Sequence, residues 1–121
     1  MNRQELENYI LDTYGVSPEY PWTKYPFFSV FRHESNKKWF AVIMTIDKCK
    51  LGISEDGQID VLNLKCDTNI VPSMWKEQGI FLAYHMNKEH WLTVALDGIT
   101  NDNNLKFLLA LSYDLTDKKK R

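Results

Sequence analysis

The chain has 121 residues, of which 44% are apolar and 13% aromatic, and its formal net charge at neutral pH is −1. This length and composition predict one globular domain over residues 1–121 with a single hydrophobic core. The mean hydropathy of −0.41 and the lack of any long apolar run argue against a membrane span. A net charge near zero gives no general attraction to phosphate, so any nucleic-acid site must be a local patch.

The amino-terminal segment has the pattern of an amphipathic helix. Mostly apolar or aromatic residues recur there at helical spacing, at Leu6, Tyr9, Ile10, Thr13 and Tyr14. Gly15 and then Pro18 are expected to end this helix. A loop rich in proline and aromatic residues follows it.

The cysteines and the start of the chain suggest a reducing compartment. No basic and then apolar secretory signal opens the sequence, so we expect a cytoplasmic protein. Cys49 and Cys66 have neither the spacing of a disulfide framework nor that of a CxxC pair. We expect both to remain free thiols.

The hydrophobic period changes after Pro26 from helical to alternating. Short β-branched and aromatic runs predict strands over 27–32, 38–46, 49–54 and 59–66, joined by tight turns. The run at 38–46 is apolar on both faces, which predicts a strand inside the sheet and not at its edge. Asp67 is a candidate N-cap for a helix over 68–78, with Pro72 near its first turn.

The last third predicts two more strands and a final helix. The strands are expected over 80–86 and 90–96, with a turn at 87–89. One face of the final helix is expected to carry Leu105, Leu108, Leu109, Ser112 and Leu115. The fold class is then α+β, a single antiparallel sheet of at least five strands with the first and last helices on the same face. Residues 118–121 are expected to form a frayed basic tail.

Catalytic motifs are missing from the sequence. The phosphate loop, the dinucleotide fingerprint, the nucleophile elbow and the HExxH zinc motif do not occur. His85 and His90 could share a zinc ion with Cys66 or His33, and Cys66 with His85 could form a nucleophile pair, but no third ligand or orienting group is defined by spacing. We therefore expect no catalytic residues, no bound metal and no cofactor.

Four segments, taken together, resemble one known family. They are YPFF at 25–28, NLKCD at 63–67, YHMNKEHW at 84–91 and SYDL at 112–115. Their order and spacing are similar to those of the MmcQ/YjbR (YjbR-like) family of small bacterial proteins. The chain departs from the family at Phe28, where members usually have glycine, and at Thr68, where they usually have proline.

The resemblance implies a frataxin-like α+β sandwich with a so-called double-wing arrangement, in which a sheet and its loops face duplex DNA. Members are commonly labelled DNA-binding on this fold-level likeness. The implied function is non-catalytic contact with the phosphate backbone through lysine-bearing turns, weak and indifferent to sequence, because arginines that read base edges are few. The candidate residues are Lys48, Lys50, Lys65, His85, Asn87, Lys88, His90 and Trp91.

Two other functions stay open from the sequence. A protein-interaction or regulatory adaptor would use the aromatic loop at 20–28, with Trp22, Tyr25, Phe27 and Phe28 as anchors for an unidentified protein partner. A small-molecule binder would use a pocket near His85, with Lys65 and Asn87. We expect a monomer that does not bind membranes.

Overall fold

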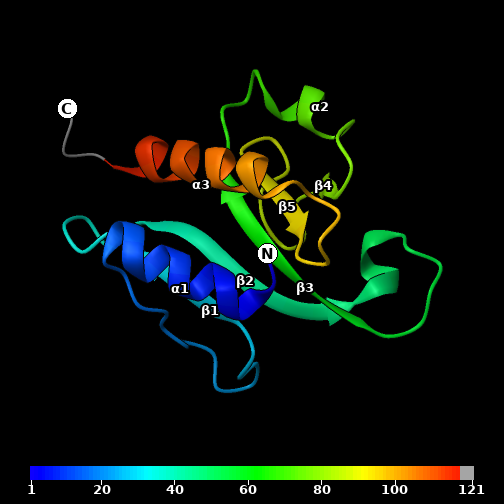
Figure 1. Ribbon diagram of the computed structural model, residues 1–121, viewed down its shortest axis with the longest axis horizontal. Helices are drawn as coiled ribbons and strands as arrows, with labels where there is room; N and C mark the ends of the chain where they lie inside the picture. The colour runs from blue at the N-terminus through cyan, green and yellow to red at the C-terminus, as the bar shows by residue number, and fades with distance from the viewer. Residues whose placement is uncertain (118–121) are drawn as a thin grey trace.

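A five-stranded antiparallel sheet forms the centre of the computed structural model, which describes residues 1–117 (Figure 1). The strands are β1 (Ser29–Arg32), β2 (Trp39–Asp47), β3 (Gln58–Lys65), β4 (Ile80–Leu82) and β5 (Trp91–Ala95). They pair in the order β1-β2-β3-β5-β4, with every neighbouring pair antiparallel. The strand predicted to lie inside the sheet, β2, does so between β1 and β3.

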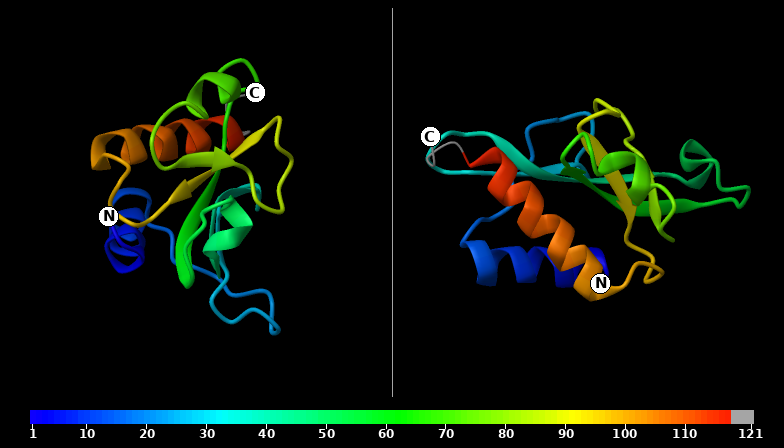
Figure 2. Two further views of the ribbon diagram at one scale, coloured as in Figure 1. Left: turned by 90° about the vertical axis from the view of Figure 1, so that its right-hand side faces the viewer. Right: turned by 90° about the horizontal axis from the view of Figure 1, so that it is seen from above.

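Helices α1 (Arg3–Tyr14) and α3 (Asp102–Thr116) cover one face of this sheet (Figure 2). Their apolar stripes meet inward-facing side chains of the strands in one core, formed by Leu6, Ile10, Phe31, Phe40, Ile43, Leu62, Leu64, Leu92, Leu105, Leu108 and Leu109. The predicted fold class and the placement of both helices on the same face are confirmed. We call this the helix face.

The ends of α1 follow from local chemistry. The Asn2 side chain accepts a hydrogen bond from the Glu5 N–H, and the Glu5 carboxylate accepts one from the Asn2 N–H, each at 2.9 Å. This capping box satisfies amides that would otherwise lack partners. Gly15 ends the helix with φ of 69°, a left-handed conformation that glycine adopts without strain, as the sequence predicted.

A buried serine fastens α3 to the sheet. The Ser112 Oγ donates to the Phe40 carbonyl at 2.6 Å and accepts from the Lys65 N–H at 2.9 Å. These two backbone groups lie one position beyond the last β2–β3 pair, Ala41 with Leu64. The hydroxyl therefore joins the two strands where their own pairing stops, and it fixes the carboxyl half of α3 over that point.

Loops cover the opposite face of the sheet, which we call the loop face. Parts of the segments after α1 and after β4 lie on this side of the sheet (Figure 2). Buried side chains from the strands form a second apolar cluster there, of Val30, Val42, Met44, Ile46, Ile59, Val61 and Ala95. Half-buried residues, most of them aromatic, pack against that cluster, namely Trp22, Phe28, Trp39, Leu51, Phe81 and Tyr84.

Two predicted elements are wrong where left-handed residues interrupt the chain. The expected strand at 49–54 is instead the 3-10 helix η1 (Lys48–Leu51), which Gly52 ends with φ of 79°. The last β2–β3 pair is Asp47 with Gln58, and the Lys48 N–H then donates to the Gly57 carbonyl and closes the connection. Residues 49–54 lie within this connection and not in a strand. The strand expected at 80–86 is present but ends at Leu82; beyond it the Tyr84 N–H donates to the Thr93 side chain and His85 has φ of 60°.

The helix expected at 68–78 is much shorter, and one residue of the last helix was misplaced. The short helix α2 (Val71–Met74) has Ile70 as its N-cap, while the Asp67 carboxylate accepts from the Asn69 N–H and forms a turn before it. Pro72 lies in its first turn. In α3 the buried face continues to Thr116, and Leu115 is 39% exposed. The predicted tail at 118–121 lies outside the described residues.

Candidate nucleic-acid interface

The loop from 83 to 90 is built around one left-handed residue and one tight turn. His85 has φ of 60°, which few residues other than glycine adopt without cost. Two residues further on, the Asn87 side chain accepts from the Glu89 N–H at 2.8 Å, and its carbonyl accepts from the Trp91 N–H at 3.0 Å. Asparagine thus closes the turn, as the sequence predicted, and Lys88 lies exposed at its tip.

A buried polar network holds the first half of this loop against the sheet. Thr93 of β5 accepts from the Tyr84 N–H at 2.8 Å through Oγ1 and donates to the side-chain oxygen of Asn63. The Asn63 amide donates to the Tyr84 carbonyl at 3.3 Å and also contacts the sulfur of Met44. Both polar side chains are fully buried. The network holds both backbone polar groups of Tyr84, the residue just before His85.

The loop at 83–90 and the aromatic loop at 20–28 together enclose a cavity of about 310 Å³ on the loop face. We call it the aromatic pocket; its walls are Trp22, Tyr25, Phe28, Trp39, Tyr84 and Met86. Met44 and His85 complete the lining of this pocket. Trp22 packs edge to face on Trp39, with ring centroids 5.6 Å apart, and on Phe28 at 6.1 Å. Rings fixed in this way give the pocket a preformed shape.

A second hollow of about 480 Å³ adjoins it, and we call it the lysine hollow. Its lining includes Lys50, Leu51, Phe81, Tyr84, His85 and Lys88. Lys50 comes from η1 and Lys88 from the 83–90 loop, so two distant segments bring cations to one place. Within residues 1–117 no ion pair engages either lysine, whereas Lys48 is bound to Glu55 at 3.0 Å. Tyr84 and His85 line both the hollow and the aromatic pocket.

The other residues of the sequence hypothesis lie outside these two cavities. Asn87 shapes the turn, and His90 is held by a hydrogen bond of 3.0 Å between its Nδ1 and the Thr68 hydroxyl. Trp91 is half-buried and pairs with Lys65 across β5 and β3. Of the eight predicted residues, the lysine hollow therefore gathers Lys50, His85 and Lys88.

The metal and nucleophile alternatives find no support in the geometry. Among residues 1–117, no group of three or more His, Cys, Asp or Glu side chains is placed to hold a metal ion. Cys66 is buried in the core of the helix face, and this burial raises the pKa of its thiol, which disfavours the thiolate. Cys49 is exposed, and both cysteines are free, as predicted.

The four aromatic anchors of the adaptor hypothesis divide into two pairs. Trp22 and Phe28 pack against the apolar cluster of the loop face, so their apolar area already serves the fold. Tyr25 and Phe27 are exposed by 52% and 67%. The Tyr25 ring stacks on Phe28 with centroids 4.8 Å apart and lines the aromatic pocket, whereas Phe27 faces a separate hollow beside α1.

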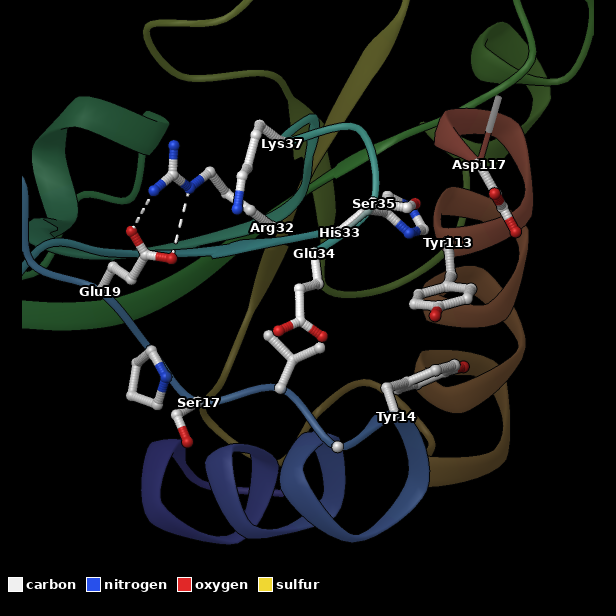
Figure 3. A pocket seen from close by; sticks show the side chains of 13 residues that line it. Tyr14, Ser17, Glu19, Arg32, His33, Glu34, Ser35, Lys37, Tyr113 and Asp117 are labelled. Carbon is white, nitrogen blue, oxygen red and sulfur yellow. Dashed lines mark hydrogen bonds and ion pairs between the residues drawn. The ribbon is translucent and has the colours of Figure 1, made fainter. Parts of the chain in front are cut away.

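A larger polar cleft of about 640 Å³ lies elsewhere, between the ends of α1 and α3 and the β1–β2 hairpin (Figure 3). Its charges are mixed: Arg32 pairs with both carboxylate oxygens of Glu19, and Glu34 lies beside them. His33 is buried and its Nε2 contacts the Thr116 hydroxyl at 2.7 Å. Burial lowers the pKa of His33 despite the nearby Asp117 carboxylate. The cleft therefore has no field of a single sign.

Sequence reasoning missed several residues that build the site. Trp39, Met44 and Met86 line the aromatic pocket, and each lay in a predicted strand without being proposed as a site residue. Asn63 and Thr93 were also missed, although each is a polar residue within an apolar strand run. A polar side chain at an inward strand position requires a buried partner, and this was the available signal.

The fold and site define a class: a small α+β domain with two helices on one face of an antiparallel sheet and a loop-lined aromatic pocket on the other. The family model YjbR matches residues 11–115, and the chain belongs to the YjbR family. The segments that suggested this family in the sequence were a correct guide. No helix in residues 1–117 has the length and apolar character needed to cross a membrane.

Similar proteins have been described in several bacteria. The uncharacterized protein YyaQ of Bacillus subtilis (strain 168) is 39% identical over 116 residues, which are 96% of this chain and 98% of that protein. A Pseudomonas syringae protein of known crystal structure superposes with a TM-score of 0.94 at 44% identity, covering 96% of this chain and 99% of that one. Deinococcus radiodurans protein DR2400, domain DUF419, superposes with a TM-score of 0.73 at 27% identity, covering 99% and 81%.

Proposed function

We propose that the protein is a non-catalytic DNA-binding module that contacts phosphates through the lysine hollow of the loop face. The observation that carries this proposal is the convergence of Lys50 and Lys88 with His85 around one hollow. Neither lysine is engaged in an ion pair within residues 1–117, so both ammonium groups remain available to an anion. A chain with net charge −1 thereby has one local cationic site.

The chemistry of the hollow predicts weak binding that does not depend on sequence. An ammonium group on a flexible stem contacts phosphate as a point charge and does not provide the flat fork with which arginine reads guanine. Non-specific binding of this kind typically has a dissociation constant of about 10⁻⁴ to 10⁻⁶ M at physiological salt. Tight, sequence-specific recognition is not expected from these residues.

The test is the salt dependence of duplex binding, measured by fluorescence anisotropy with a labelled 20-base-pair duplex. Lys50→Ala and Lys88→Ala should each weaken binding equally on unrelated sequences. Each should also reduce the slope of log affinity against log salt by about 0.9, the value of one phosphate contact. Lys106→Ala is the matched control, because that lysine lies on α3 over the Tyr9 ring, on the helix face. No binding of the wild type at low salt would refute the proposal.

An adaptor function is the second candidate, and the exposure of Phe27 favours it. A ring that is 67% exposed beside the similarly exposed Tyr25 is a typical anchor for a protein partner. If the wild type binds no nucleic acid at low salt, this second function replaces the first.

A further inference from the structure

The two cavities of the loop face are neighbours with opposite chemistry. The aromatic pocket is walled by rings and methionines, and the lysine hollow carries two cations. Tyr84 and His85 belong to both, so a ligand could enter one cavity and extend into the other across these two residues. A ligand that matches both cavities has an apolar planar part joined to an anionic part.

The size and lining of the aromatic pocket suit a single flat ring. Its volume of about 310 Å³ lies at the lower end of the range of about 300–1,000 Å³ found for ligand pockets. Trp22, Trp39 and Tyr84 are half-buried, so part of each ring remains accessible. Every nucleobase has a π-face that stacks on such rings irrespective of its identity.

His85 has a backbone conformation that is unfavourable for a residue with a side chain. A left-handed non-glycine residue is disfavoured, and such residues cluster at ligand sites, where the surrounding structure holds them in place. Here the Asn63–Thr93 network secures the preceding backbone. The imidazole lies against the Tyr84 ring, with centroids 4.1 Å apart, at the boundary of the two cavities. A glycine would satisfy the backbone there without strain but would leave the boundary without a polar group.

We propose that the loop face binds one unpaired nucleotide, with the base in the aromatic pocket and its phosphate in the lysine hollow. This proposal rests on the DNA-binding function and defines its substrate as single-stranded or free nucleotide. His85 lies between the two parts, where the sugar of the bound unit would pass. The Tyr25 ring closes the outer wall of the base site, since it is exposed and stacks on Phe28.

The same chemistry occurs in a single strand and in a free nucleotide, and the choice of probes separates them. Fluorescein-labelled dT8, a hairpin duplex, dTMP and thymidine are each titrated against the protein, with tryptophan fluorescence for the two small probes. Stacking of one base corresponds to a factor of roughly 5 to 150 in affinity, so dT8 should bind at least about fivefold more tightly than the duplex. If dTMP binds as tightly as dT8, the ligand of the site is a free nucleotide. If dT8 binds much more tightly than dTMP, the ligand is a single strand.

Two neighbouring exposed aromatics provide a matched pair of variants. Tyr25→Ala removes a wall of the aromatic pocket and should lower dT8 affinity by about fivefold or more while leaving duplex affinity unchanged. Phe27→Ala removes a still more exposed ring that lies outside the pocket, and it should leave both affinities within about twofold. Lys50→Ala should weaken dTMP binding but not thymidine binding.

The outcomes separate this inference from the function on which it rests. Equal binding of duplex and dT8, with both weakened by the lysine variants and neither by Tyr25→Ala, would overturn the nucleotide site and leave DNA binding intact. Thymidine binding as tightly as dTMP would overturn the role of the lysine hollow. If none of the four probes binds at low salt, both proposals fail.

Discussion

Replacing Thr93 by valine tests the buried network that holds the 83–90 loop. Valine has nearly the shape of threonine, so the packing changes little, but the hydroxyl is lost. The Tyr84 N–H then lacks its acceptor, and the Asn63 oxygen lacks its donor. Each unsatisfied buried group costs about 1–3 kcal/mol. The added buried methyl returns about 0.8 kcal/mol. The variant should therefore lose roughly 1–5 kcal/mol of unfolding free energy.

The assay is urea unfolding at pH 7, combined with amide hydrogen exchange. Thr68→Val is the matched control: that hydroxyl contacts His90 at an exposed site, and its loss should change stability by less than about 0.5–1 kcal/mol. Exchange of the Tyr84 amide should accelerate in Thr93→Val and remain unchanged in the control. If Thr93→Val lies within about 0.5 kcal/mol of the wild type, the network does not hold the loop and the reasoning is refuted.

Two further predictions concern a glycine and a histidine. Gly79→Ala and Gly98→Ala both introduce backbone strain, because φ is 82° at Gly79 and 90° at Gly98. Only Gly79→Ala also places the new carbon 2.1 Å from the Thr100 hydroxyl. Its free energy of unfolding in urea should therefore fall by about 1–3 kcal/mol more than that of Gly98→Ala. Equal losses of unfolding free energy in the two variants would show that the Thr100 side chain moves aside without an energetic cost. Because burial lowers the pKa of His33, the unfolded chain binds more protons, so this contribution to stability is present above about pH 6.5 and is lost as pH falls through the folded pKa. Unfolding at pH 7.5 and 5.0 should show a smaller loss in His33→Gln than in the wild type, and an identical loss would contradict the assignment.

Periodic segments were predictable because their cause is local to the sequence. The stripes of α1 and α3 and the apolar runs of β2, β3 and β5 each bury one face or both, and the pattern shows this directly. The errors at η1 and after β4 have the opposite cause. The left-handed Gly52 ends η1, and after β4 a side chain, that of Thr93, accepts the Tyr84 N–H; β-branched and aromatic composition indicates neither feature.

The candidate site was predictable only in part, because it depends on contacts between distant segments. Lys50 and Lys88 are 38 positions apart, and nothing in their spacing shows that η1 and the 83–90 loop share a hollow. Likewise Trp39 joins Trp22 only because β2 runs beneath the aromatic loop. The sequence identified the His85 segment as distinctive, and the fold determines which of its side chains meet a partner segment.

The most direct test of nucleic-acid binding at the loop face is a chemical-shift titration of the ¹⁵N-labelled protein. Oligonucleotides dT8 and a short duplex are added separately at low salt. The proposed function predicts shifts of the Lys50, His85 and Lys88 amides with either ligand, and base stacking adds shifts of the Trp22 and Trp39 indole N–H signals with dT8. Spectra unchanged by either ligand, or shifts confined to the helix face, would contradict the account.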